Sequence, residues 1–186
     1  MSAIIRMAVP QDAASITAIY GPFCTQTAIS FEVSAPTVDE MVQRIQKITS
    51  RLPWLVMEDV GEIAGYVYAS PHRDRAAYQW SVDVAAYVAT AHRRQGVGRA
   101  LYNVLLPMLA LQGYYNAYAG VTLPNPASVG LHEAFGFTHV GTYRHVGYKL
   151  GMWHDVAWFE VASQPANAEP APLRPIHEVV DLPGCT

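Results

Sequence analysis

The sequence has few cysteines and few charged residues. Of its 186 residues, 2 are cysteines and 15% are Asp, Glu, Lys or Arg. Cys24 and Cys185 lie too far apart to make a disulfide framework, so they indicate a reducing compartment. Cys24 is expected to be a half-buried free thiol rather than a nucleophile. The 12 basic and 15 acidic residues give a net charge of −3, which argues against a nucleic-acid partner.

The sequence also lacks a long uninterrupted apolar run. The closest candidate, residues 104–111, contains Pro107 and is too short to cross a bilayer. Residues 1–9 lack the long apolar stretch and small-residue cleavage site of a signal peptide. We therefore expect a soluble, cytoplasmic protein with no membrane partner. Its hydrophobic fraction of 51% is enough for one sizeable core.

Periodicity and turn residues predict a mixed α/β domain with one central sheet over residues 1–162. The predicted strands cover residues 3–9, 54–58, 62–70, 78–88, 116–121, 137–143 and 153–161. The predicted helices cover residues 12–20, 37–52, 98–111 and 125–136. Five prolines in residues 163–186 predict a tail without regular structure, extended or draped over the surface.

Local signals set several helix boundaries. Thr37 and Glu40 have the spacing of a capping box, which predicts the start of the second helix. Gly21 and Pro22 are expected to break the first helix, and Pro107 to kink the third, because proline removes a backbone donor.

The most informative segment is RRQGVGRA at residues 93–100, which follows a strand and opens a helix. Free N–H groups and the helix dipole make such a start an anion site, and flanking arginines add charge. The segment therefore predicts a diphosphate-binding turn. No Gly-Lys-Ser/Thr is present for a P-loop, and Leu101 stands where a dinucleotide fingerprint needs glycine or alanine.

Arg93-x-x-Gly96-x-Gly98 resembles the coenzyme A motif Q/R-x-x-G-x-G/A of the GNAT superfamily of N-acetyltransferases. The pattern N-x-x-S-x-x-L at residues 125–131, followed by FGF at 135–137, resembles the second conserved block of that superfamily. The resemblance implies the GNAT fold, a central, mostly antiparallel twisted sheet of six to seven strands flanked by about four helices. It also implies acetyl-CoA as co-substrate.

Further segments resemble the phosphinothricin N-acetyltransferases: residues 78–83, 131–134 and 147–156. Residues 27–32 and 72–78 look most like the branch linked to arsinothricin, the arsenic analogue. The resemblance implies acetylation of the α-amine of a glutamate analogue, with resistance by detoxification as the role. Two alternatives remain: an acetyltransferase for methionine sulfoximine, its sulfone or another amino acid, and a non-catalytic coenzyme A-binding domain.

The chemistry needs a base for the amine and an acid for the departing thiolate. Asp83 is the candidate base, because a carboxylate in a strand of Val, Ala and Tyr is expected at a cleft. The alternative is an ion pair with an arginine. The phosphinothricin enzymes usually carry glutamate there, and the shorter Asp83 favours a bridging water. His132 is the candidate acid, where many GNAT members have tyrosine; the alternative is a satisfied core histidine.

The resemblance also assigns binding residues. The acceptor would be held by Phe31, Arg73, Arg75, Tyr78 and Thr122, with the two arginines clamping acidic oxygens. Acetyl-CoA would be held by Ala86, Tyr87, Val88, Arg94, Gln95, Gly96, Val97, Gly98, Arg99, Asn125 and Ser128. Asn125 is also a candidate N-cap of its own helix. The histidines lack metal-ligand spacing, so no metal is expected. Relatives of this kind are homodimers, which implies a homodimer here.

Overall fold

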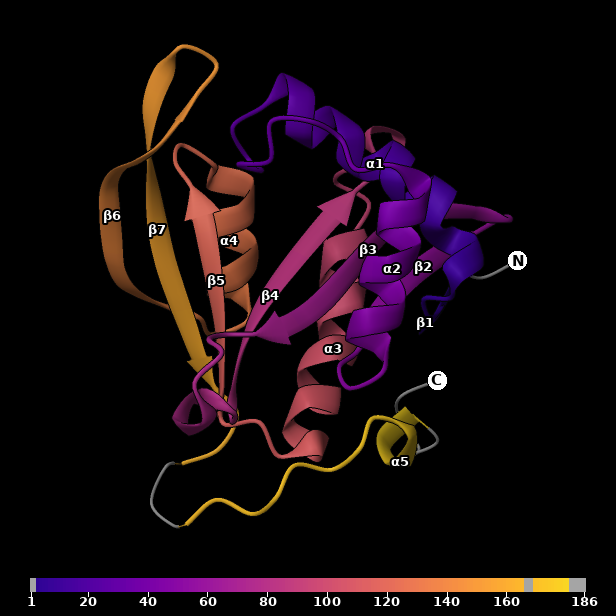
Figure 1. Cartoon of the computed structure of the whole chain (residues 1–186), viewed down its shortest axis with the longest axis vertical. Helices are drawn as coiled ribbons and strands as arrows, with labels where there is room; N and C mark the ends of the chain where they lie inside the picture. Colours follow the sequence, from indigo (N-terminus) through magenta and orange to yellow (C-terminus); the bar gives the residue numbers. More distant parts are fainter. Residues whose placement is uncertain (1–2, 166–168, 181–186) are drawn as a thin grey trace.

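The computed structural model describes residues 3–165 and 169–180, and in these residues a single sheet forms the centre of the molecule (Figure 1). Its strands are β1 (Ile4–Met7), β2 (Trp54–Asp59), β3 (Glu62–Pro71), β4 (Ser81–Val88), β5 (Asn116–Thr122), β6 (Thr138–Lys149) and β7 (Met152–Ala162). The helices are α1 (Ala13–Gln26), α2 (Val38–Thr49), α3 (Val97–Gln112), α4 (Pro126–Ala134) and α5 (His177–Val180). Three short 3₁₀ turns are η1 (Pro10–Asp12), η2 (Ala76–Tyr78) and η3 (Thr90–His92).

The sheet order is β1-β2-β3-β4-β5-β7-β6, and among the described strands only the β4–β5 pair is parallel. Helices α1 and α2 cover one face, and α3 and α4 lie on the other (Figure 1). Side chains of β2 alternate between these layers: Trp54 and Val56 pack with α1 and α2, whereas Leu55 packs with α3. The mixed α/β architecture expected from the resemblance is confirmed.

The parallel pair is short, and this creates the main opening in the fold. β4 and β5 pair only at residues 81–83 and 116–118. Beyond Asp83, β4 stays paired with β3 up to Val88, and β5 stays paired with β7 up to Thr122. The two strands therefore diverge in a V, as Figure 1 shows. The edge of β4 inside the V has backbone groups without a strand partner, which suits an extended ligand.

The predicted start of α2 is confirmed, because Thr37 Oγ1 accepts a hydrogen bond from the Glu40 N–H at 3.2 Å. The predicted break of α1 at Pro22 is wrong, since the helix continues to Gln26. Pro22 lies on the exposed side, and the buried side chains of Phe23 and Cys24 hold the last turn against the core. Packing here outweighs a proline cost of about 3 kcal/mol.

Helix α3 agrees with the helix predicted over residues 98–111 and contains Pro107 on its exposed side; the kink at Pro107 stays a prediction. Two strand boundaries differ from the sequence prediction. β4 begins at Ser81 rather than at Tyr78, because the preceding residues form the turn η2. β6 extends to Lys149, well beyond the predicted end, because it pairs with β7 along the whole hairpin.

The prediction of a tail without regular structure is wrong for residues 177–180, whereas residues 163–165 and 169–176 form no helix or strand. α5 is helical, and Ile176 and Val179 are buried in the core beneath α3. The Gln112 amide donates to the carbonyls of Arg51 and Arg174 at 2.9 and 3.2 Å, which ties the tail to the end of α3. Pro183 and Cys185 lie outside the described residues.

Cys24 is a free thiol, as expected, and it is buried.

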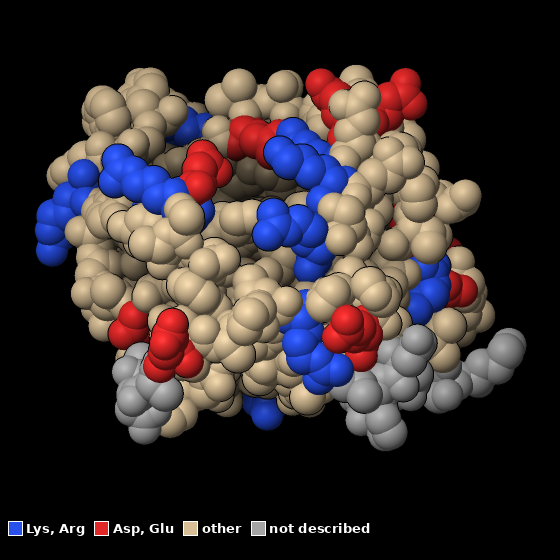
Figure 2. Space-filling view, turned by 60° about the horizontal axis from the view of Figure 1, so that its bottom comes forward, with Lys and Arg blue, Asp and Glu red and all other residues tan. Residues whose placement is uncertain are grey.

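Charges of both signs are interspersed on the face drawn in Figure 2, and a hollow in this face has basic and acidic side chains around its rim. Within residues 3–165 and 169–180, none of the helices has both the length and the apolar character needed to span a bilayer.

Candidate active site

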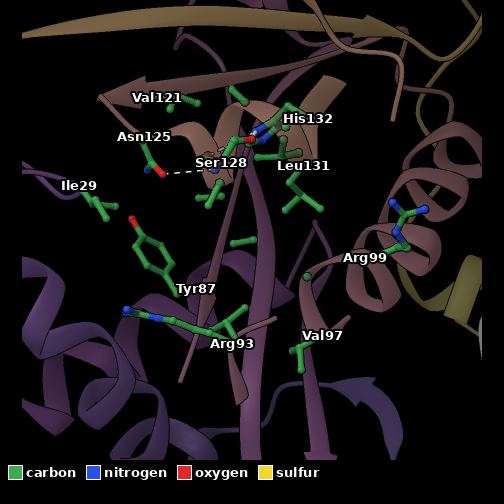
Figure 3. Close-up of a pocket in the computed structure, with 18 of the residues that line it drawn as sticks. Ile29, Tyr87, Arg93, Val97, Arg99, Val121, Asn125, Ser128, Leu131 and His132 are labelled. Atoms are coloured by element: carbon green, nitrogen blue, oxygen red, sulfur yellow. Dashed lines mark hydrogen bonds between the residues drawn. The ribbon is translucent and has the colours of Figure 1, made fainter. Parts of the chain in front are cut away.

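A cavity of about 710 Å³ fills the V between β4 and β5. Its walls are residues 84–88 of β4, residues 119–122 of β5, the turn that leads into α3, and the first two turns of α4. Figure 3 shows Tyr87 and Asn125 approaching it from different elements. A volume of this size suits a large organic ligand.

The turn before α3 forms the arginine-flanked end of the cavity. Gly96 caps the helix with φ 82°, a left-handed conformation that favours glycine. A Cβ on Gly98 would lie 3.2 Å from Leu131 Cδ2, so this glycine permits close approach of α3 to α4. Val97, Gly98 and Arg99, the first residues of α3, line the cavity together with Arg94. The positions of the glycines and arginines in this turn could be predicted from the sequence, because they depend only on residues that are close together in the chain.

Most of the predicted cofactor residues line this cavity. They are Ala86, Tyr87, Val88, Arg94, Gly96, Val97, Gly98, Arg99, Asn125 and Ser128. Gln95 is not among the lining residues; its amide donates to the Ala91 carbonyl at 2.9 Å and braces the turn. Arg93 belongs to the motif but was not predicted as a contact. It lines the cavity, with its guanidinium 5.3 Å from the Phe23 ring centroid.

Asn125 is the N-cap of α4, as the capping pattern predicts. Its Oδ1 accepts a hydrogen bond from the Ser128 N–H at 3.2 Å. The same residue lines the cavity, so its amide N–H groups remain available to a ligand.

His132 lies at the inner wall of the cavity and is 5% exposed. Its Nδ1 lies 2.7 Å from the Ser128 carbonyl, and its Nε2 lies 2.9 Å from the Tyr102 hydroxyl. The carbonyl can only accept, so Nδ1 carries the proton and Nε2 accepts from Tyr102. Burial lowers the pKa of His132, which keeps the ring neutral. With both nitrogens engaged, the geometry favours a role in fixing α4, and proton donation by His132 stays a prediction.

Asp83 lies at the vertex of the V, directly before the first cavity-lining residue of β4. Its Oδ1 is 2.6 Å from Nδ1 of His72, so its partner is a histidine rather than an arginine. Burial raises the pKa of Asp83 above its ordinary value, against the opposing effects of His72 and Arg73.

His72 was not predicted as a site residue. The signal that could have found it is the β3–β4 register, in which Ser70 pairs with Asp83. His72 follows Ser70 by two positions, so both side chains point to the same face as Asp83. Neither residue type nor spacing along the chain reveals this pairing, because the register depends on the turn that joins the strands.

Aromatic rings surround the His72 side chain. It stacks on Tyr118 with centroids 4.5 Å apart and meets the edges of Tyr78 and Trp158 at 5.9 and 6.1 Å. The Arg73 guanidinium lies 6.0 Å from the Trp158 ring centroid. Of the predicted acceptor residues, Arg73 and Tyr78 therefore meet at this cluster. Arg75 lies on the exposed turn before η2.

The remaining predicted acceptor residues lie on other elements. Thr122 lines the cavity at the end of β5. Phe31 lies in the segment between α1 and α2, and its ring packs against Gly147 of β6 and lies 6.4 Å from the His154 ring centroid. Phe31, Arg73, Arg75, Tyr78 and Asp83 are not among the lining residues of the cavity.

The Phe31 segment is clamped by Lys149, a buried lysine that the sequence did not reveal as part of the site. Its Nζ donates to the carbonyls of Ser30 and Glu32 at 2.5 and 2.7 Å, and lies 3.5 Å from that of Phe23. Glu32 in turn forms a bidentate ion pair with Arg44, at 2.7 and 3.0 Å. The position of Phe31 therefore depends on contacts from β6 and α2.

A cavity with an anion-binding helix start at one end and a partly desolvated carboxylate at its vertex can hold a phosphorylated carrier beside an amine. A sequence profile described as Acetyltransferase (GNAT) domain matches residues 5–158. A phosphinothricin N-acetyltransferase from Streptomyces viridochromogenes is 38% identical over 175 residues, covering 94% of this chain and 95% of that protein. An L-methionine sulfoximine/L-methionine sulfone acetyltransferase from Salmonella typhimurium is 30% identical, covering 84% of this chain and 92% of that protein.

A solved structure shows the same fold. It is a GNAT superfamily phosphinothricin acetyltransferase from Sinorhizobium meliloti in complex with acetyl-CoA, with a TM-score of 0.88 and 32% identity, covering 92% of this chain and 94% of that one. Together with the profile match, these likenesses show that the chain belongs to the GNAT superfamily and, within it, to the phosphinothricin N-acetyltransferase family of amino-acid N-acetyltransferases.

Proposed function

We propose that this enzyme transfers the acetyl group of acetyl-CoA to the α-amine of a glutamate analogue with a tetrahedral acid, phosphinothricin or arsinothricin. The observation that carries the proposal is the position of Asp83, at the vertex of a cavity whose other end is an arginine-flanked helix start. This arrangement puts a carboxylate close to where the amine would meet a thioester.

The proposal gives each side of the V a role. The first N–H groups of α3, with Arg94 and Arg99, would bind the pyrophosphate, and residues 86–88 would pair with the pantetheine arm like an added strand. Asn125 and Ser128 would bound the arm from α4. The residues fit the group, because β4 offers a free backbone edge and α3 offers unpaired donors. The thioester supplies the acetyl group; the protein supplies position, charge and a route for protons.

On the acceptor side, Arg73 would contact the acidic oxygens of the substrate, with Tyr78 and Phe31 as walls and Thr122 at the far end. Arg75 would join Arg73 as a second donor from the exposed turn. Acetylation would remove the positive charge of the α-amine, so the product would no longer resemble a glutamate-like substrate, which is the basis of a role in resistance.

A turnover panel tests the acceptor. The enzyme is assayed for thiol release with phosphinothricin, arsinothricin, methionine sulfoximine, methionine sulfone and glutamate. We expect the highest kcat/KM for the two tetrahedral acids, and Arg73→Gln should raise their KM more than that of the neutral sulfone. Equal kcat/KM for acid and sulfone would contradict the proposal.

Methionine sulfoximine or sulfone is the second candidate, and one observation favours it. The Arg73 guanidinium lies over Trp158, and rings of Tyr118 and Tyr78 lie nearby, so the acceptor side is more aromatic than a purely anionic substrate requires. An apolar methyl group would suit these rings. A preference for the sulfone in the same panel would establish this candidate instead.

We further propose that the enzyme is a homodimer joined through the β6–β7 hairpin. Large apolar side chains on this hairpin are exposed, including Tyr148 at 61% and Trp153 at 57%. Clustered exposed apolar residues of this size mark interaction surfaces. Light scattering at increasing concentration tests the state: the wild type should be a dimer and Trp153→Lys a monomer. A monomeric wild type would contradict the proposal.

A further inference from the structure

The strongest unexplained feature is the His72–Asp83 pair. Nδ1 of His72 lies 2.6 Å from Oδ1 of Asp83, the residue of β4 at which the pairing with β5 ends. The pair is partly buried, with side-chain exposures of 14% for His72 and 28% for Asp83. A histidine held this closely by a carboxylate is a common arrangement for proton transfer.

The surrounding rings fix the orientation of the imidazole. His72 stacks on Tyr118 and is bounded by the edges of Tyr78 and Trp158, so it cannot turn freely. Since an ionised carboxylate only accepts, the proton of neutral His72 lies on Nδ1. The lone pair is then on Nε2, which forms no hydrogen bond with any residue that the structure describes. One basic atom is therefore available beside the vertex of the cavity.

The length of the acidic side chain at position 83 explains why a histidine would be needed beside it. The related enzymes usually carry glutamate where this chain has Asp83, so the carboxylate here ends one methylene earlier. Because Nδ1 of His72 binds the Asp83 carboxylate, the basic atom Nε2 lies on the other side of the imidazole ring, one ring width further from the carboxylate. The pair thereby restores the reach that aspartate alone lacks.

We propose that Nε2 of His72 accepts the proton of the substrate amine and that Asp83 holds the ring and stabilises its charge. This inference rests on the proposed function. The ammonium gives one proton to Nε2, and the freed nitrogen lone pair forms the bond to the thioester carbonyl carbon. The carbon–sulfur bond breaks with its electron pair on sulfur. The second amine proton passes to that thiolate, and His72 releases its proton to solvent.

Several charged or titratable groups face the ring. The carboxylate of Asp83 in β4 would stabilise the imidazolium, whereas the guanidinium of Arg73 in the adjoining turn would oppose it. Glu160 of β7 pairs with Tyr118 in the sheet and adds a second negative charge on that side. The ring therefore has two carboxylates and one guanidinium around it.

Three variants test the assignment with phosphinothricin as the probe. His72→Phe keeps a ring against Tyr118 but has no nitrogen. His72→Asn places an amide N–H near the position of Nδ1, so it can still bind Asp83, but has no basic atom. His139→Phe changes an exposed histidine of β6 outside the site and is the matched control.

We expect His72→Phe and His72→Asn both to lower kcat by about 10²-fold or more. Acetyl-CoA affinity by calorimetry and the melting temperature should stay close to those of the wild type, as should all properties of His139→Phe. The deficit should shrink as the pH rises past the pKa of the substrate amine, because a growing fraction of the amine is then neutral without a base. Recovery of wild-type kcat by His72→Asn would overturn the inference, since His72 would then only position Asp83.

The two proposals fail in different ways. If the wild type releases thiol with phosphinothricin but both His72 variants match its kcat, the assignment of His72 is wrong and the proposed function stands. If the wild type binds acetyl-CoA but acetylates none of the amino acids in the panel, the proposed function is wrong and the assignment of His72 falls with it.

Discussion

Replacing Lys149 with methionine should loosen the segment that carries Phe31. The ammonium is 6% exposed and donates to the carbonyls of Ser30 and Glu32 at 2.5 and 2.7 Å. Methionine keeps most of the aliphatic packing but cannot donate. The substitution therefore isolates the hydrogen bonds from the packing.

The magnitude follows from those two short bonds. A hydrogen bond from a charged donor contributes about 1.5–3 kcal/mol, so the two bonds together contribute about 3–6 kcal/mol. Partial hydration of the freed carbonyls offsets some of this, which leaves about 2–4 kcal/mol. For a chain of this size the loss corresponds to a fall in Tm of roughly 5–15 °C.

Thermal unfolding measures the loss of stability in Lys149→Met, and steady-state kinetics measures the change in KM for each substrate. We expect Lys149→Met to lower the Tm and to raise the KM for the amine more than the KM for acetyl-CoA, because the Phe31 wall moves while the start of α3 does not. Lys47→Met is the control, since Lys47 is exposed on α2. If the two variants have the same Tm and the same KM for the amine, Lys149 does not clamp this segment.

Three further outcomes are expected. In Gly147→Ala the new Cβ would overlap the Phe31 ring, so the KM for the amine should rise several-fold, whereas Gly141→Ala, with open space around it, should match the wild type in the same assay. Truncation after residue 162 removes two buried apolar side chains beneath α3 and should cost about 3–6 kcal/mol of stability in urea unfolding, at about 1.5–3 kcal/mol per side chain; an unchanged urea midpoint would contradict the packing. The Arg44 hydrogen bonds hold the pKa of Glu32 below its ordinary value, so this stabilisation is present above the unfolded pKa of about 4.3 and is lost as pH falls through the folded value. Glu32→Gln should therefore lower the Tm at pH 7 but not at pH 3, and an equal change at both would show that charge plays no part.

Much of the arginine-flanked end of the cavity could be predicted from the sequence because its geometry is local. The turn at residues 93–99, the αL position of Gly96 and the capping role of Asn125 each depend on residues a few positions apart. Capping and helix-start geometry follow from such short-range patterns. The acceptor side could not be predicted to the same extent. It is assembled from β3, β4, β5, β7 and the segment after α1, which meet only through strand register and packing.

The amino-acid sequence by itself determined the order of strands and helices, the position of the glycine turn and the acidic residue of β4. Backbone propensities and hydrogen bonds between near neighbours suffice for those features. Only the tertiary structure decided that Asp83 pairs with His72, that Lys149 holds the Phe31 segment, that α1 continues through Pro22, and that the tail packs under α3. Each of these depends on contacts between residues distant in the chain, whose energies are set by burial and register rather than by local preference.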